Sequence, residues 1–246
     1  MLFEHSDGGN PKGERQEGEI NPATMLPRRP FDGEDFFEEM PTPANKYCGF
    51  ILDRCVHGEK FWRVAILTRE FGSVSCFVRI SGKNKTTVVP DLFDEAEILL
   101  EKPKSGSESD PRFAKEYNLV HRNSGIAKSY TALSVASKFV AILAKNAFPV
   151  DSAESLYTLC ANTFRALAEK PNQEACYLKA LWTLARDGGY PVKEDWLKNS
   201  NSADVQEIVA ILRSPLESVV ADARDVVRHS RRLESWLERE HRFVLA

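Results

Sequence analysis

The hydrophobic period of the sequence changes once, near residue 129, and this change constrains the fold more than any other feature. Before it, apolar and polar residues alternate along 61–67 and 74–80, which is the period of a half-buried strand. After it, apolar residues recur every three or four positions, which is the period of an amphipathic helix. Strands followed by helices, rather than strands alternating with helices, predict an α+β protein.

The first half contains several short strand patterns separated by polar segments. "TREFG" joins two of them, and its Gly72 suits a backbone turn with a positive φ angle. We expect strands in "YCGFILDR", "KFWRVAILT", "SVSCFVRI", "TTVVP", "AEILLE" and "KEYNLVHR". Five or six such strands suit a small β-barrel better than a βαβ sheet.

The second half predicts a helical bundle. A helix starting near Glu174 should end at Gly188 and Gly189, with Pro191 just beyond. "DSAE" at 151–154 and "SPLE" at 214–217 both resemble capping boxes, so we expect a helix to begin at each. Further helices are expected around 205–212 and 233–237.

Charge and composition divide the chain into three parts. Residues 1–45 carry a net charge of -6, are rich in Gly and Pro and show no periodicity, so we expect a disordered acidic tail. Residues 46–128 carry +3 and form the predicted barrel domain, while 129–246 carry 0 and form the predicted helical domain. The basic middle segment favours an anion-binding surface there.

Several classes of protein are disfavoured by what the sequence lacks. It has no apolar run long enough to cross a membrane and no secretion signal, so we expect a cytoplasmic protein without a membrane partner. It has no C-x-x-C, H-E-x-x-H, G-x-S-x-G or phosphate-binding glycine loop, so we expect no metal site, no cofactor and no catalytic residues. We therefore expect a binding protein and no enzyme.

Between Tyr47 and Trp236 the chain resembles the bacterial recombination mediator RecO. The resemblance rests on "GFILDR", on "ILTREFGSVSCFVRI", on the basic "SGKNKT" that follows, and on "PDLFDEAEILLEKPKSG". In the helical half it rests on the Gly-Tyr-Pro at 189–191 and on the basic "RHSRRLESW". It implies an N-terminal OB-fold barrel followed by an all-helical domain.

One feature of many RecO proteins is missing. They carry a four-cysteine zinc module after the Gly-Tyr-Pro, and here "VKEDWLKNSNSADV" contains neither Cys nor His. A tetrahedral structural zinc needs four nitrogen or sulfur ligands, so we expect no zinc module.

In an OB barrel, oligonucleotides bind over strands 2 and 3 and the adjoining loops. Cations that neutralise phosphates and rings that stack on bases alternate along this part of the sequence. The candidate nucleic-acid-binding residues are Phe61, Arg63, Arg69, Phe77, Arg79, Lys83, Lys85, Lys104 and Arg122. The alternatives are that these charges only solvate a barrel rim and its loop, that the two phenylalanines pack under a loop, and that Arg69 is a local partner in the turn.

The resemblance implies a function without covalent chemistry. A RecO-like mediator binds single-stranded DNA, anneals complementary strands and helps load RecA onto DNA covered by single-strand-binding protein (SSB). The implied partners are RecR and the acidic, apolar C-terminal tail of SSB, for which we expect a groove on the helical domain near Arg165 or Lys179. The competing hypothesis is a protein-interaction scaffold whose barrel no longer binds nucleic acid.

Overall fold

A computed structural model of the chain describes residues 45–80, 88–101, 112–146 and 148–245. The predicted tail, apart from Asn45, and the candidate residues Lys83, Lys85 and Lys104 lie outside these ranges. The strands are β1 (Asn45–His57), β2 (Phe61–Thr68), β3 (Gly72–Arg79), β4 (Glu95–Leu100) and β5 (Arg112–His121).

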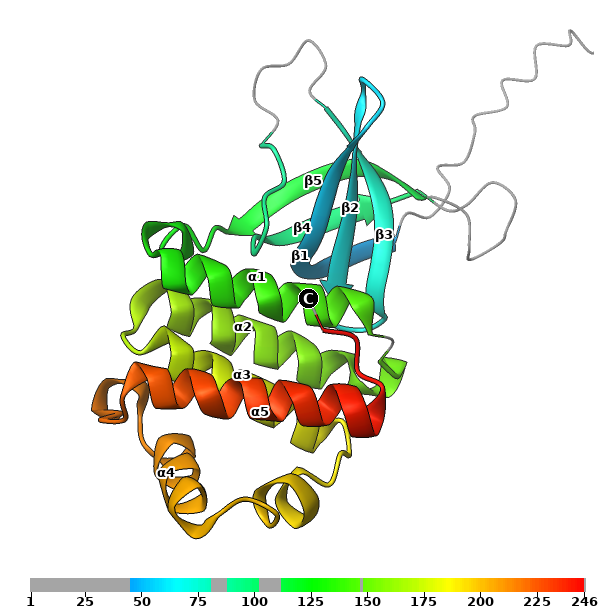
Figure 1. The fold of residues 1–246 in the computed structure, drawn as a ribbon. Coiled ribbons are helices and arrows are strands. Elements are labelled where there is room, and N and C mark those ends of the chain that lie inside the picture. Colours follow the sequence, from blue (N-terminus) through cyan, green and yellow to red (C-terminus); the bar gives the residue numbers. More distant parts are fainter. Residues whose placement is uncertain (1–44, 81–87, 102–111, 147, 246) are drawn as a thin grey trace, which may run out of the picture. The chain divides into compact units, whose positions relative to one another are not determined.

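The five strands close into a barrel (Figure 1) in the order β1-β2-β3-β5-β4, with β4 pairing back to β1. All neighbours are antiparallel except β3 and β5, which pair in parallel over a short stretch. Alternate side chains fill the interior, which is lined by Tyr47, Ile51, Val64, Ile66, Cys76, Val78, Ile98 and Leu100. The predicted α+β class is thereby confirmed, and the barrel is compatible with an OB fold.

The expected strand in "TTVVP" is not formed in its described part, residues 88–90. Arginine side chains take the carbonyl groups that a strand would have used: Arg122 donates to the oxygen of Val89 (3.0 Å) and Arg54 to that of Pro90 (2.7 Å). Pro90 also has no backbone N–H to offer a ladder.

The helices are α1 (Tyr130–Lys145), α2 (Ala153–Glu169), α3 (Gln173–Asp187), α4 (Ser202–Arg213) and α5 (Ala223–His241). Short polar residues cap the starts of three of them: Ser129, Asn201 and Asp222 accept hydrogen bonds from backbone N–H groups of the first turns of α1, α4 and α5. The predicted end of α3 is confirmed: the helix ends at Asp187, directly before Gly188, and Gly189 adopts a φ of 79°.

The prediction that a helix begins at "SPLE" is wrong. Only a 3₁₀ turn, Leu216–Ser218, follows Pro215, and α5 begins later, at Ala223. The side-chain amide of Asn172 donates to the carbonyl oxygens of Leu216 (2.7 Å) and Val219 (3.3 Å). Those oxygens are therefore satisfied without a helix.

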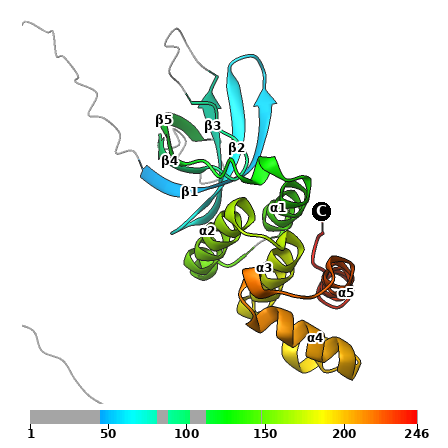
Figure 2. The ribbon, with the colours of Figure 1, turned by 90° about the vertical axis from the view of Figure 1, so that its left-hand side faces the viewer.

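One apolar core joins the barrel to the helices. Phe50, Leu52, Leu67 and Phe93 of the barrel half pack into the same buried cluster as the helices. Phe164 of α2 contributes to the junction, since its ring lies 5.4 Å from that of Phe50 and 5.5 Å from that of Phe93. In both views α1 and α2 lie next to the barrel and α4 lies on the far side of the bundle (Figures 1 and 2).

Within the described ranges, no helix combines the length and the apolar character needed to cross a membrane.

Candidate nucleic-acid interface

The register of β2 and β3 brings four of the candidate residues together on the outside of the barrel. Phe61 pairs with Arg79, and Arg63 pairs with Phe77, two rungs further along the same two strands. The residues of opposite parity on the same two strands, Val64, Cys76 and Val78, point into the barrel and are buried. Because side chains alternate across a strand, Phe61, Arg63, Phe77 and Arg79 share the outer surface, as the sequence predicts.

A third phenylalanine, Phe113 of β5, completes this surface and was missed by the sequence reasoning. It pairs with Phe77 across the short parallel contact, and the two rings stack with centroids 5.4 Å apart and planes at 29°. Phe61 meets Phe113 edge-on at 5.4 Å. The strand expected here, "KEYNLVHR", began at Lys115 and left out Phe113, whereas β5 begins at Arg112. The alternation in "RFAKEY" was an available local signal, but nothing local could show that β5 lies beside β3. We call Phe61, Phe77 and Phe113 the phenylalanine cluster.

Rings in the phenylalanine cluster are accessible and bordered by cations. Phe113 is 42% exposed, and the guanidinium of Arg79 lies 5.8 Å from the centre of the Phe61 ring. A hollow of about 520 Å³ lies at this point, lined by Phe61, Arg79, Glu101, Phe113, Ala114 and Lys115. Flat rings beside exposed cations are the arrangement on which single-stranded bases stack and phosphates are neutralised.

Arg63 faces the same surface and remains free to exchange partners. Its guanidinium lies 3.9 Å from the carboxylate of Asp53 on β1, and both side chains are about half exposed. A long ion pair in water contributes little to stability, so a phosphate can replace the carboxylate at low cost.

The structure places Arg69 away from the phenylalanine cluster. It follows β2 at the turn end of the hairpin, whereas Phe61 and Arg79 lie at the other end, about 23 Å away for seven residues of strand. Its guanidinium contacts α2, at 3.6 Å from the carboxylate of Glu154 and 4.5 Å from the ring centre of Tyr157. Arg69 thus links the hairpin turn to the helices, a role outside the turn itself that the sequence reasoning did not foresee.

Arg122 is held by a buried acid. Asp94, only 1% exposed, accepts hydrogen bonds from Nε (3.0 Å) and Nη2 (2.7 Å) of Arg122. The hydrogen bonds to Asp94 raise the pKa of Arg122 above its usual value. Its guanidinium neutralises a charge that would otherwise be buried alone, so its main role in this structure is structural.

The two residues expected near a partner groove differ in their surroundings. Lys179 of α3 donates to the carbonyl oxygens of Leu212 (3.2 Å) and Ser214 at the end of α4, and burial lowers its pKa. Arg165 of α2 is exposed. Neither residue lines the two grooves found along α5.

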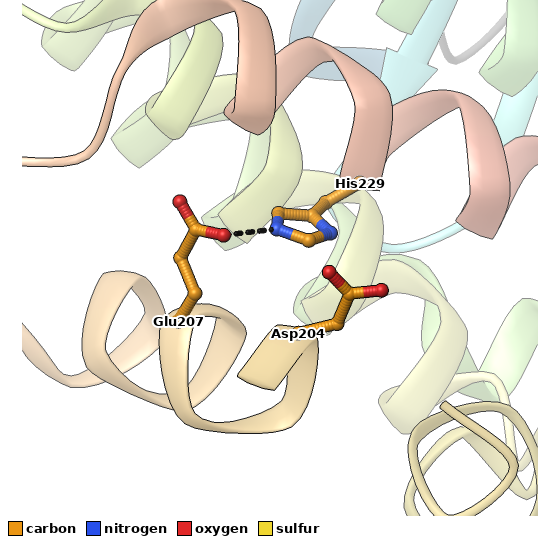
Figure 3. Close-up of side chains that lie close together, drawn as sticks. All are labelled: Asp204, Glu207 and His229. Atoms are coloured by element: carbon orange, nitrogen blue, oxygen red, sulfur yellow. Dashed lines mark hydrogen bonds and ion pairs between the residues drawn. The ribbon is translucent and has the colours of Figure 1, made fainter. Parts of the chain in front are cut away.

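Three side chains of metal-ligand type lie together between α4 and α5: Asp204, Glu207 and His229 (Figure 3). His229 is fully buried and its Nε2 lies 2.9 Å from Oε2 of Glu207. Asp204, however, already accepts hydrogen bonds from Arg228 (2.9 Å) and from Arg232. Two guanidinium groups beside the carboxylate supply the positive charge that a metal would bring and would repel a cation, so the triad fits an ion-pair network and not a metal centre.

Comparison with known proteins adds no assignment: no protein-family model matches this chain, and no curated protein matches it.

Proposed function

We propose that this chain is a RecO-like mediator in DNA recombination and repair, acting in the cytoplasm through an OB-fold barrel and a helical domain without a zinc module. It binds single-stranded DNA without catalysis, promotes annealing of complementary strands and assists loading of RecA onto SSB-coated DNA. The proposal rests on the resemblance of the strand and turn motifs and, in the structure, on one observation. That observation is the exposed phenylalanine cluster bordered by Arg63 and Arg79 on strands 2 and 3 of a small barrel.

The surface supports binding by stacking and charge, without base-edge recognition. Stacking of one base on an aromatic ring contributes about 1–3 kcal/mol and tolerates any sequence, because every base has a π face. Neutralised phosphates release counterions, which makes the affinity fall as salt rises. A base that stacks on a ring through one π face keeps its hydrogen-bonding edge free. Annealing requires that edge, because the complementary strand pairs with it.

The partners remain part of the proposal. RecR and the SSB tail are implied by the resemblance, and Arg165 is the exposed member of the pair expected to receive the tail. Because Lys179 is engaged by the end of α4, it offers less to a carboxylate than the sequence suggested.

The test is a titration of fluorescently labelled oligo-dT with wild-type protein and the double variant Phe77→Ala/Phe113→Ala, at several salt concentrations. Loss of two stacking rings should weaken binding at least tenfold, at about 1 kcal/mol or more for each ring. The matched control is Phe71→Ala, because Phe71 is also an exposed phenylalanine (58%) but lies at the turn end of the hairpin. Circular dichroism verifies that each variant is folded.

Annealing of complementary labelled strands should slow in the same variant. A wild-type protein that does not bind oligo-dT even at low salt contradicts the proposal and favours a scaffold whose barrel no longer binds nucleic acid. Equal binding by Phe77→Ala/Phe113→Ala and wild type would remove the phenylalanine cluster from the proposed site.

A further inference from the structure

Helix α5 carries a line of arginines on one of its faces. Arg224, Arg228, Arg231 and Arg239 are separated by four, three and eight residues, and Arg232 is next to Arg231. Residues at such spacings lie above one another on a helix. The line is about 22 Å long, at 1.5 Å of rise per residue. We call these five residues the α5 arginine row.

The α5 arginine row borders a groove of about 490 Å³. The opposite side is formed by Asp195, Trp196 and Asn199, which belong to the segment between α3 and α4. Among the described residues that line this groove, five are arginines and one, Asp195, carries a carboxylate. The helical domain has no net charge, so this concentration is invisible in the domain's composition.

Two arginines of the row, Arg228 and Arg232, are held in place by a carboxylate of α4. Asp204, whose side chain is 9% exposed, bonds to both Arg228 and Arg232, and Arg232 also donates to Ser200 (3.0 Å). The hydrogen bond from Arg228 holds the pKa of Asp204 below its usual value. The Glu207–His229 contact lies beside Asp204 (Figure 3). The bonds from Asp204 therefore fix the positions of Arg228 and Arg232 before any ligand binds.

The other three arginines are exposed, and within the described ranges none of them forms an ion pair with a carboxylate. These are Arg224, Arg231 and Arg239; Arg239 donates only to the backbone oxygen of Ser235 in its own helix (3.2 Å). Exposed guanidinium groups with no carboxylate partner are available to an anionic ligand.

The groove favours a repeating anion over an apolar peptide. A peptide anchor requires an open apolar pocket, and the two tryptophans of the lining, Trp196 and Trp236, expose only 5% and 8% of their surface. What the groove presents is charge repeated along a straight line. A nucleic-acid backbone carries one negative charge per nucleotide at regular spacing and is bound by Arg forks without reading sequence.

We propose that the groove along α5 binds the phosphate backbone of a nucleic acid, as a contact separate from the phenylalanine cluster on the barrel. The phenylalanine cluster and the α5 groove would contact a nucleic acid through different interactions. The barrel offers rings for unstacked bases, whereas the groove along α5 offers guanidinium groups and keeps its two tryptophans almost fully buried. Binding at α5 is therefore indifferent to whether the bases are paired.

The experiment compares Arg224→Ala/Arg231→Ala/Arg239→Ala in the full chain with a control of equal charge, Lys145→Ala/Lys193→Ala/Arg213→Ala. The control residues are exposed, lie in the same domain and do not line the groove. Arg228 and Arg232 are left intact because they neutralise Asp204. Labelled oligo-dT and a labelled duplex are titrated at several salt concentrations, and thermal unfolding shows that both variants fold.

For oligo-dT, loss of three phosphate contacts should reduce the slope of log affinity against log salt by about 2, at about 0.7 for each contact, and the control should keep the wild-type slope. Duplex affinity should fall in the groove variant as well. The same titrations of Phe77→Ala/Phe113→Ala separate this result from the barrel proposal. If the affinity of that variant equals the wild-type affinity while the groove variant loses affinity, the barrel assignment fails and the α5 site stands.

Unchanged slopes in the groove variant would overturn the α5 proposal. It would also be overturned if the groove variant lost binding to a labelled peptide of alternating Asp and Phe while its oligonucleotide affinity stayed at the wild-type value, because the groove would then be a peptide site.

Discussion

Replacing Arg122 by Ala separates the two roles that this residue can have. The sequence predicts that Arg122 contacts DNA. In the structure its guanidinium instead pairs with the carboxylate of Asp94, which is 1% exposed. The substitution removes the hydrogen bonds from Nε and Nη2 to Asp94 and the one from Nη2 to the oxygen of Val89. We therefore expect a large loss of folding stability and no specific loss of DNA affinity in the folded variant.

The size of the stability loss follows from the charge left behind. Removing one partner of a buried ion pair costs about 3–5 kcal/mol. Asp94 retains hydrogen bonds from the backbone N–H of Asp91 (3.0 Å) and from the hydroxyl of Tyr117 (3.4 Å), and Arg122 itself is 41% exposed. Water can reach the vacated position, so we expect the lower end, about 3 kcal/mol.

Equilibrium unfolding in urea, followed by tryptophan fluorescence, measures this loss. With an m-value of about 2 kcal/mol per M, the unfolding midpoint of Arg122→Ala should fall by about 1.5 M. The control is Arg63→Ala, which breaks an exposed pair at 3.9 Å and should cost less than about 1 kcal/mol. Adding Asp94→Asn to Arg122→Ala removes the stranded charge and should recover part of the loss.

Two results would refute this reasoning. One is an Arg122→Ala midpoint as close to wild type as that of Arg63→Ala. The other is a stable Arg122→Ala protein with strongly reduced oligo-dT affinity, which would return Arg122 to the nucleic-acid interface.

Two further predictions concern the helical domain and its junction with the barrel. The pKa of Asp204 is lowered by its hydrogen bond to Arg228, so its carboxylate stabilises the folded protein above the unfolded pKa of about 4, and this contribution is lost as pH falls through the lowered folded pKa. Asp204→Asn should therefore be less stable than wild type at pH 7, with a difference that shrinks towards pH 2 in urea titrations; a constant difference would contradict the role of the charge. Phe164→Ala should lower stability by about 3–5 kcal/mol in calorimetry, because the fully buried ring packs against Phe50, Phe93 and Phe139; a loss below about 1 kcal/mol would mean that the junction core rearranges.

Local pattern predicted the parts of the fold that depend on local physics. Alternation along 61–67 and 74–80 was sufficient to place Phe61, Arg63, Phe77 and Arg79 on one face, and the register confirms it. The period of two specifies the side of a strand on which a residue lies, whatever the neighbouring strand is. The end of α3 at Gly188 and Gly189 was predictable for a similar reason, since the turn there needs a positive φ.

Prediction failed where a distant residue changed the outcome. At "SPLE", where a helix was expected, Asn172, more than forty positions earlier, donates to the carbonyl oxygens of Leu216 and Val219, which a helix would have used for its own hydrogen bonds. Arg69 and Arg122 are candidate DNA contacts in the sequence, yet Glu154 and Asp94 engage them from other elements. Local pattern contains no information about such partners.

The sequence by itself determined the class of the protein: strands before helices, and a strand face that alternates rings with cations. Local backbone preferences and the side-chain period are sufficient for this, because both act between near neighbours. Only the tertiary structure decided which charges are available to a ligand. It placed Phe113 beside Phe77, buried Asp94 against Arg122, and aligned the α5 arginine row along a groove. The availability of a charge depends on its nearest partner in space, and chain folding brings that partner from far away in the sequence.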